Sequence, residues 1–323
     1  MKMNELANPS TGYSTTRTLI RKIPAEVVDK FSEVKFDIFR KSDNQSFEHG
    51  GQRVAGCFKY DSSNLPLVSV ITIVFNGVRY IEETIESVIN QDYDNVEYII
   101  IDGGSTDGTL DILKKYDSLI DYWVSEPDSG ISDAFNKGIS LSRGLWVGII
   151  NADDWYESGV FSSLVKYDSY DVVYGDMQCW RSGVKSLKYI SNHLDLGKTM
   201  TLNHPSVFVK RLIYAKYGCF DAEYKVAMDY ELLLRLWVND VSFFCVDHIY
   251  SNFRAGGVSD KHQFLGYKEV RRAKLKYRVS SKFCSWLQYM KSYLKGKLSR
   301  FIRLSGGEYF LSSYSALFSK YKK

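Results

Sequence analysis

The sequence predicts an α/β fold with a mainly parallel central sheet and helices on both of its faces. Short apolar runs alternate with segments of helical periodicity, which is the pattern of parallel-sheet proteins. Three of the apolar runs end in turns rich in acidic residues and glycine. The chain has 323 residues, of which 45% are hydrophobic and 25% charged, so it can bury a large core. Because ligands bind at the carboxyl ends of parallel strands, these acidic turns predict a binding site.

The first strand follows a polar N-terminal extension, residues 1–65, in which we expect only a short helix at 25–31. Residues 67–75 are apolar and rich in β-branched side chains, as in a strand covered on both faces. Asn76-Gly77 then predicts a turn. The later elements are expected as a helix at 80–89, a strand at 96–101, a helix at 110–116 with Thr106 or Asp107 as its N-cap, a strand at 121–124, a helix at 131–139 and a strand at 145–150.

Beyond residue 157 the alternation weakens. Strands are expected at 171–176 and 241–246, and 203–209 is a mixed polar segment. Residues 228–237 have the spacing of an amphipathic helix.

Charge and cysteine content narrow the class of protein. The net charge is +4, but residues 261–323 alone hold 16 Lys and Arg against two acidic residues, so an acidic body carries a basic tail. The five cysteines include no C-x-x-C pair, which argues against a disulfide scaffold and a zinc site and favours the cytoplasm. We expect no signal peptide and no membrane-spanning helix, because the strongest apolar run has 9 residues and a span needs about 20.

The segment Asn151-Ala152-Asp153-Asp154 predicts a metal site. It follows the apolar strand at 145–150, so its carboxylates meet solvent at a strand end. Mg²⁺ and Mn²⁺ take oxygen ligands, often one or two carboxylates together with substrate phosphates. Asp153 is the predicted ligand, with Asn151 and Asp154 shaping the surroundings. An ordinary solvated turn remains the alternative.

The loop from Asp102 to Thr109 matches neither common phosphate motif. Ser105 stands where a dinucleotide fingerprint needs its second glycine, and Thr109 stands where a P-loop needs lysine. What remains is an acid at a strand end followed by a glycine turn. Asp102 could accept hydrogen bonds from a base N–H or a ribose hydroxyl, or the segment could be a plain turn with a helix cap.

Three further residues are candidates from their positions. Asp229 lies in the first turn of the helix at 228–237, where it is either a general base or a favourable partner of the helix dipole. His204 could contact phosphate, metal or acceptor, or be structural. Arg254, in a glycine-rich segment, could meet a diphosphate or form a surface ion pair.

Taken together, these segments resemble the family 2 glycosyltransferases of the GT-A fold, most closely bacterial enzymes that build surface polysaccharides. The resemblance covers roughly residues 66–259. It rests on Val68-Ser69-Val70-Ile71-Thr72 with Asn76-Gly77, on the stretches 101–109 and 126–138, on Asn151-Ala152-Asp153-Asp154 and on Met228-Asp229-Tyr230-Glu231. It implies a nucleotide-sugar-binding half at 66–178, an acceptor-binding half at 179–260 and a basic helical tail at 261–323.

The resemblance also implies an activity and residue roles. The activity is an inverting transfer from a nucleotide-diphosphate sugar, usually UDP-linked, to a hydroxyl of a glycan or lipid-linked glycan, assisted by Mn²⁺ or Mg²⁺. Asp229 would be the base and Asp153 the metal ligand. The donor would be bound by Thr72, Val74, Asn76, Asp102, Gly104, Asp128, Asp133, Asn136, Lys137, Asn151, Ala152 and Arg254, and acceptor or phosphate by His204, Asp154 and Trp155. Asn151 departs from the family pattern, because it replaces the first acid of D-x-D.

The basic tail contains an amphipathic helix. Trp286, Met290, Leu294, Leu298 and Phe301 recur at helical spacing among lysines and arginines. Residues 268–304 therefore predict peripheral contact with an anionic membrane, on the inner face of the plasma membrane, or packing on the acidic body or a partner subunit.

Two other classes of function are alternatives to a glycosyltransferase. A non-catalytic nucleotide-sugar or glycan-binding protein is favoured only by Asn151. A nicotinamide oxidoreductase is disfavoured by the missing glycine fingerprint. No nucleic-acid partner is expected.

Overall fold

The computed structural model describes residues 12–21, 47–256 and 262–304, and the helix expected at 25–31 lies outside them. The chain divides into two compact units. The first comprises the described residues up to Val173 together with Val207–Cys219, and the second comprises Tyr174–Ser206 and the described residues from Phe220 onward. This division falls five residues before the predicted boundary at 178, and the segment 207–219 returns to the first unit.

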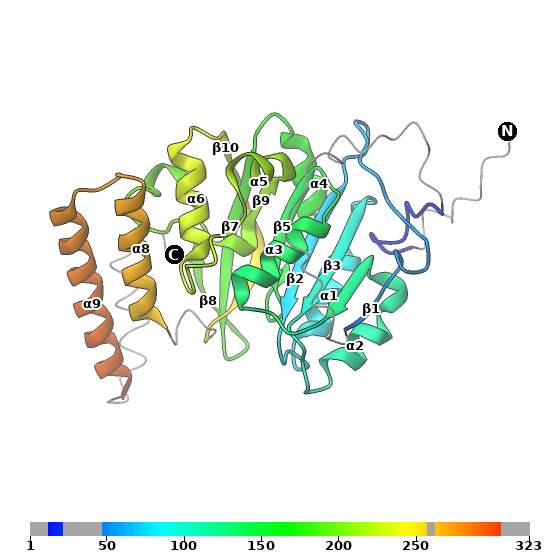
Figure 1. Cartoon of the computed structure of the whole chain (residues 1–323), viewed down its shortest axis with the longest axis horizontal. Helices are drawn as coiled ribbons and strands as arrows, with labels where there is room; N and C mark the ends of the chain where they lie inside the picture. The colour runs from blue at the N-terminus through cyan, green and yellow to red at the C-terminus, as the bar shows by residue number, and fades with distance from the viewer. Residues whose placement is uncertain (1–11, 22–46, 257–261, 305–323) are drawn as a thin grey trace. The chain divides into compact units, whose positions relative to one another are not determined.

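The first unit is built on a mostly parallel sheet (Figure 1). In spatial order its strands are β1 (Glu48–Gly50), β4 (Tyr122–Ser125), β3 (Val96–Asp102), β2 (Val68–Val74), β5 (Trp146–Asn151) and β9 (Val207–Lys210). The four central strands run parallel, and β1 and β9 pair antiparallel at either side. The α/β class and the four central strands predicted from the sequence are confirmed.

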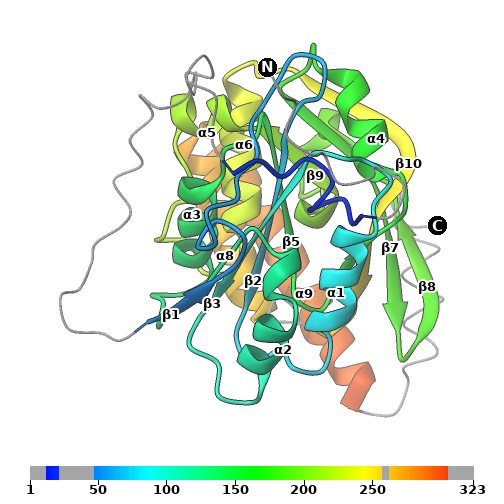
Figure 2. The same cartoon turned by 90° about the vertical axis from the view of Figure 1, so that its right-hand side faces the viewer.

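Helices cover both faces of this sheet, as the sequence predicts. α1 (Ile81–Ile89) and α3 (Ile131–Leu141) lie on opposite sides of it in Figure 2, while α2 (Thr109–Lys115) follows β3 in the chain. The strand β3 is buried along its whole length, which explains its continuous apolar sequence. The helix α3 packs closely, because a Cβ on Gly138 would lie 2.3 Å from the Ile71 side chain.

The register of the sheet brings the acidic turns to one edge. Val74 pairs with Asp102 and Ile73 pairs with Asn151, so β2, β3 and β5 end side by side. One local expectation is wrong: the N-cap of α2 is Gly108, with φ +98°, rather than Thr106 or Asp107. Glycine adopts this left-handed backbone without the steric cost that a side chain would bring.

The N-terminal extension, where it is described, belongs to the first unit. Its strand β1 pairs with β4, and the fully buried Lys59 amine contacts both carboxylate oxygens of Asp121 at 2.7 and 2.6 Å. A three-residue strand carries too little periodicity to be found in the sequence.

The second unit contains most of β7 (Val172–Arg181), the hairpin strand β8 (Val184–Tyr189), and β10 (Phe243–Arg254) beside β7. Its helices are α6 (Met228–Val238), α8 (Gln263–Lys276) and α9 (Lys282–Leu304). β10 extends well past the strand predicted at 241–246, whose apolar run is interrupted by the exposed Asp247 and His248 and later by the buried Ser251 and Asn252. Consequently Arg254 lies at a strand end.

Short elements complete the two units. They are β6 (Trp155–Tyr156), α4 (Val160–Leu164) and α5 (Arg211–Tyr217) in the first unit and 3-10 turns at Asp117–Leu119, Val165–Tyr167, His193–Asp195 and His204–Ser206. Where the structure describes the chain, no helix has both the length and the apolar character that a bilayer span requires.

Candidate functional site

The turn after β2 and the loop after β3 are joined by side-chain hydrogen bonds. The Asn76 N–H donates to Ser105 Oγ at 2.7 Å, and Asn76 Oδ1 accepts from the Thr106 N–H at 2.9 Å. Asn76 has φ +52°, a left-handed conformation that asparagine tolerates better than most residues. The two loops are therefore one assembly rather than two independent turns.

Asp102 organises this assembly from the end of β3. Its carboxylate is fully buried, and Oδ2 accepts from the N–H groups of Gly104 at 3.2 Å and Ser105 at 2.9 Å and from the Ser125 hydroxyl at 2.6 Å. Oδ1 accepts from the Ser105 hydroxyl. Gly104 takes φ +83°, which closes the turn. A base N–H that reached Asp102 would have to displace one of these hydroxyls.

Asp107 holds the far side of the same loop. Oδ2 accepts from the Val78 N–H at 3.0 Å, while Oδ1 accepts from the Thr109 N–H at 3.0 Å and the Thr109 hydroxyl at 2.6 Å. Desolvation acts to raise the pKa of Asp107, but these hydrogen bonds together lower it below its ordinary value of 3.8. Sequence reasoning did not name Ser105, Asp107 or Thr109 as site residues. The sequence feature that could have identified them is the run of short polar side chains in Ser-Thr-Asp-Gly-Thr, which readily bond to nearby main-chain groups.

The loop at 126–137 brings further carboxylates to this edge. Asp128 Oδ1 accepts from the Gly130 N–H at 2.8 Å, and Asp133 Oδ2 accepts from the Ser129 N–H at 3.0 Å. A Cβ on Gly103 would lie 2.7 Å from Asp128 Oδ2, so this loop touches the β3 loop.

Lys137 contributes the cation of this edge. Its amine lies 2.8 Å from Glu126 Oε1 and 3.5 Å from Asp133 Oδ2. Burial acts to lower the pKa of Lys137, but the carboxylates of Glu126 and Asp133 raise it above its ordinary value. The amine therefore stays charged at neutral pH. Asn136, its neighbour on α3, is half-buried.

The two acids after β5 that the sequence places near a metal differ in how far they are buried. The fully buried Asp154 accepts from the Asn151 amide at Oδ2, 3.1 Å, and its main-chain oxygen accepts from the Thr84 hydroxyl at 2.7 Å. Asp153 is only half-buried. Ala152 lies beside the β2 turn, because a Cβ on Gly77 would be 3.5 Å from the Ala152 Cβ. Trp155 begins β6 and is half-buried.

A divalent cation fits this segment only with help from a substrate. In the described ranges, no three His, Cys, Asp or Glu side chains gather as a metal-binding group. Asp153 and the Asn151 side-chain oxygen could supply two oxygen ligands. That donor set suits Mg²⁺ or Mn²⁺ when a diphosphate and water supply the rest.

The candidates within β2 are deeply placed. The Thr72 hydroxyl lies 3.0 Å from the Tyr98 hydroxyl and is fully buried, and Val74 is also buried. The Val74 main-chain oxygen accepts from the Gly103 N–H at 2.9 Å. Their contact with a nucleotide stays a prediction.

In the second unit, Asp229 and His204 come together. Asp229 Oδ2 lies 3.6 Å from His204 Nδ1, and their side chains are 23% and 24% exposed. Asp229 is in the first turn of α6, and His204 opens the 3-10 turn His204–Ser206. Sequence reasoning named both residues but gave no reason to pair them. A carboxylate beside an imidazole, open to solvent, can accept a proton.

The loop that leads into α6 is held by a residue of the tail. Glu269, on α8, is 5% exposed. Its Oε1 accepts from the Lys225 N–H at 2.9 Å, and its Oε2 accepts from the N–H groups of Val226 at 2.9 Å and Ala227 at 2.8 Å. Sequence reasoning missed Glu269, although it is the lone acid of the strongly basic stretch 261–307.

Arg254, the last predicted donor contact, ends β10 and is half-buried. Ala255 beside it donates its N–H to the Trp180 main-chain oxygen at 3.0 Å, which ties this strand end to β7.

A family model and similar known proteins agree on one family. The family model described as "Glycosyl transferase family 2" matches residues 69–204. An uncharacterized glycosyltransferase of Mycobacterium tuberculosis is 32% identical over 185 residues, which are 54% of this chain and 70% of that protein.

Two solved structures share the fold. TarS 1–349 of S. aureus in complex with UDP-GlcNAc has a TM-score of 0.53 at 19% identity, over 72% of this chain and 73% of that one. The mannosyltransferase PcManGT from Pyrobaculum calidifontis, in complex with GDP-Man and Mn²⁺, has a TM-score of 0.55 at 17% identity, over 80% and 82%.

Proposed function

This chain belongs to glycosyl transferase family 2, and from that premise we propose that it is an inverting glycosyltransferase with a nucleotide-diphosphate sugar, a UDP-sugar, as donor. The acceptor is a hydroxyl of a glycan or lipid-linked glycan in polysaccharide biosynthesis. The observation that carries the proposal is Asp229, a solvent-accessible carboxylate at the start of α6 with His204 Nδ1 3.6 Å away.

The donor binds at the strand-end loops of the first unit. Asn76 and Gly104 shape the loop that faces the nucleotide, and Asp102 binds the base by exchanging a loop hydroxyl for a base N–H. Asp128, Asp133 and Lys137 border the diphosphate and sugar. The hydrogen bonds that already fix these loops support this role, because a preformed site loses little entropy on binding. The remaining donor contacts that we propose are Thr72, Val74, Asn136, Asn151, Ala152 and Arg254.

Asp153, with the Asn151 side-chain oxygen, would hold Mn²⁺ or Mg²⁺ against the donor diphosphate. A bound cation would neutralise negative charge that grows on the departing nucleotide. Asp154 supports this segment from its buried position, through its bonds to Asn151 and Thr84. Trp155 follows in the same segment and would contact the acceptor or a phosphate.

Asp229 takes the proton from the acceptor hydroxyl as the oxygen attacks the anomeric carbon. One displacement breaks the bond to the diphosphate and inverts the configuration of that carbon. His204 lies close enough to orient the carboxylate, and to pair with it when protonated. General-base catalysis of this kind contributes about 10²–10⁴-fold to a rate.

The enzyme works at the cytoplasmic face of the membrane, on which α9 lies. One side of α9 packs on α8, where Tyr293 meets Phe264 with ring centroids 5.1 Å apart. Another side exposes large apolar side chains, namely Phe283, Trp286, Leu287, Leu294 and Leu298. Its lysines and arginines complement anionic lipid. Paired Leu294→Gln and Leu298→Gln changes should release the protein from phosphatidylglycerol vesicles, and unchanged vesicle binding would show that this face of α9 does not bind lipid.

The donor assignment is tested by a thermal-shift screen of UDP-, GDP-, dTDP- and CMP-linked sugars with and without Mn²⁺. We expect stabilisation by a UDP-sugar that increases with the metal. Slow hydrolysis of that donor, followed by NMR, then reports the mechanism, because an inverting enzyme first releases the opposite anomer. Release of the same anomer would refute inversion. Binding without any turnover would favour the alternative, a non-catalytic nucleotide-sugar or glycan-binding protein, which Asn151 in place of an acid favours.

A further inference from the structure

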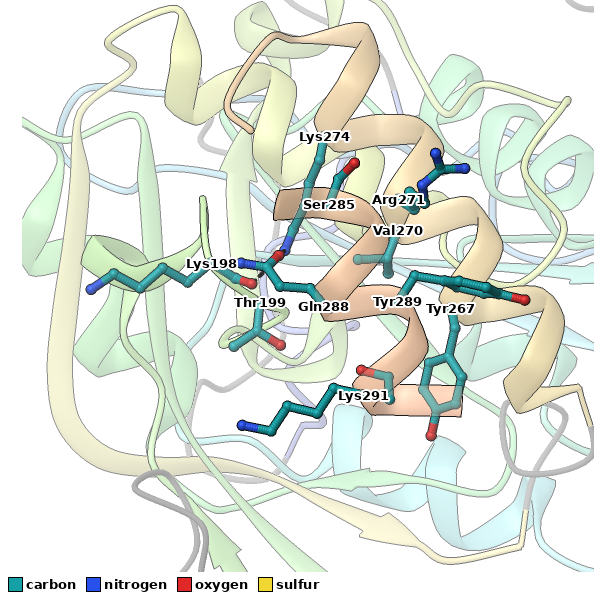
Figure 3. A pocket seen from close by; sticks show the side chains of 11 residues that line it. Lys198, Thr199, Tyr267, Val270, Arg271, Lys274, Ser285, Gln288, Tyr289 and Lys291 are labelled. Carbon is teal, nitrogen blue, oxygen red and sulfur yellow. Dashed lines mark hydrogen bonds between the residues drawn. The ribbon is translucent and has the colours of Figure 1, made fainter. Parts of the chain in front are cut away.

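A cavity of about 320 Å³ lies between α8, α9 and the segment at residues 198–199, all within the second unit (Figure 3). Four of its lining side chains are cationic: Lys198, Arg271, Lys274 and Lys291. The other lining residues are Thr199, Tyr267, Val270, Ser285, Gln288, Tyr289 and Ser292. None of these lining residues, all from the described part of the chain, is acidic. The cavity thus combines positive charge with hydroxyl and amide donors.

Lys274 is the most unusual member of this lining. The residue is 3% exposed, yet its amine contacts only neutral oxygens in the described structure: the Lys198 main-chain oxygen and Gln288 Oε1, the latter at 2.6 Å. Burial lowers the pKa of Lys274 to about 8, from an ordinary 10.5. At neutral pH the amine is largely protonated. A buried ammonium that lacks a carboxylate partner costs free energy that a bound anion would recover.

A second lining residue also has a buried donor that lacks a partner. Arg271, one turn earlier on α8, has its Nε buried, and among the described residues that nitrogen has no hydrogen-bond partner. Buried polar groups without partners are uncommon in folded proteins, so each one calls for a ligand, water or ion. The Lys198 side chain, by contrast, is 77% exposed and its amine pairs with Asp195 Oδ1 at 2.6 Å, so its charge is already balanced.

From this arrangement we propose that the cavity between α8 and α9 binds a phosphate group, carried by a soluble phosphate or by a phospholipid headgroup. Phosphate accepts several charge-assisted hydrogen bonds at once, and lysine and arginine are its usual protein partners. The Lys274 amine and the Arg271 guanidinium bind its oxygens, and Ser292 lies in the same lining. This site is separate from the strand-end loops of the first unit and contains neither Asp153 nor Asp229.

The site is distinct from the exposed face of α9 as well. Leu294 and Leu298, on that face, do not line the cavity, whereas Lys291 does. Substitutions can therefore remove the phosphate site without removing the apolar face. Lys274→Met keeps the length and apolar stem of the side chain while deleting its charge, and it should leave the fold intact because it removes a costly buried ammonium.

The test measures binding of inorganic phosphate to the full chain by calorimetry at pH 7. Wild type should bind, and Lys274→Met should weaken binding about tenfold or more, as expected for loss of a hydrogen bond to a charged group. Lys291→Gln, a change at an exposed lining residue, should weaken it as well. Lys268→Met is the matched control, since Lys268 is exposed on the same helix outside the cavity and should bind phosphate as wild type does.

Vesicles separate the two sources of phosphate. Because the apolar face of α9 also contacts anionic vesicles, weaker binding of Lys274→Met than of Lys268→Met to phosphatidylcholine vesicles that contain phosphatidic acid would identify a lipid headgroup. Binding of inorganic phosphate with no such difference on vesicles would identify a soluble phosphate. If Lys274→Met and Lys291→Gln match wild type with both probes, or if Lys268→Met loses as much as they do, the proposal is overturned.

Discussion

The two units fix their candidate functional residues in opposite ways. In the first unit, each carboxylate accepts most of its hydrogen bonds from neighbours in the chain: Asp102 from residues two and three positions later, and Asp107 from one two positions later. Each also accepts one bond from a more distant residue, the Ser125 hydroxyl for Asp102 and the Val78 N–H for Asp107. In the second unit, the loop before Asp229 is held by Glu269, 42 to 44 residues further on. The donor loops are therefore shaped mainly by bonds within the first unit, many of them local, whereas the loop before the base depends on the helical tail. Damage to α8 should impair chemistry before it impairs donor binding.

The largest effect is expected from the base itself. Asp229→Asn keeps the shape of the side chain but cannot take a proton, so the transfer rate should fall about 10²–10⁴-fold. Donor affinity should not change, because the strand-end loops are untouched. Steady-state turnover checks the expected fall in rate, and calorimetric titration of the donor checks that its affinity is unchanged. Asp247→Asn, at an exposed acid of the same unit, is the control. Near-wild-type turnover of Asp229→Asn would remove it from the mechanism.

The next effect tests the long-range support. Glu269→Gln places an amide where three main-chain N–H groups now donate to a carboxylate, so the loop at 225–227 must shift. We expect kcat to fall about 10- to 100-fold, since small misplacements of a catalytic group are costly, with little change in donor affinity. Glu269 is a positioning residue, so the decisive result is a lower kcat together with an unchanged donor affinity.

Glu223→Gln is the matched control for Glu269. Glu223 lies in the same loop and pairs with Arg272 of α8, but both side chains are largely exposed. Exposed ion pairs contribute little, so this variant should keep nearly full activity. Equal losses in the two variants, or a parallel loss of donor binding in Glu269→Gln, would mean that the tail supports the whole unit rather than the base.

Features with a local sequence pattern could be predicted from the sequence, and contacts between distant residues could not. The strands that end at Val74, Asp102 and Asn151 were found because burial on both faces produces continuous apolar runs. Their shared edge followed from parallel topology. The pairing of His204 with Asp229 and the role of Glu269 could not be found, because neither has a local pattern. The extent of β10 was missed because polar residues, some exposed and some buried, interrupt the apolar run after Val246.

A smaller effect is expected from the locally held loop. Asp107→Asn keeps one acceptor oxygen but loses the second, so either the Val78 N–H or the Thr109 groups lose their partner. A net hydrogen bond contributes about 1 kcal/mol, which predicts a roughly fivefold rise in the donor KM with kcat unchanged. Asp92→Asn, at an exposed acid of the same unit, should behave as wild type.

The acid dependence of stability provides a second reading of Asp107. Its folded pKa lies below 3.8, so its contribution to stability is present above pH 3.8 and is lost as the pH falls through the folded value. The stability difference between wild type and Asp107→Asn should therefore shrink in acid. A difference that stays constant from neutral to acidic pH would show that the lowered pKa has another origin.

The last effect, on stability rather than on activity, concerns Lys274, the buried cation on the helix that also carries Glu269. Its folded pKa of about 8 lies below the ordinary 10.5, so between these values the unfolded chain binds a proton that the folded chain does not. Raising the pH through this window should therefore stabilise wild type relative to Lys274→Met, and below pH 8 the difference should level off at its least favourable value. Urea unfolding of both proteins from pH 7 to 10 measures this. Saturating phosphate should flatten the difference, because a bound anion keeps the amine protonated in the folded state. If the two proteins keep parallel profiles without phosphate, the pKa of Lys274 is not lowered in the folded state, and its amine already has an anionic partner.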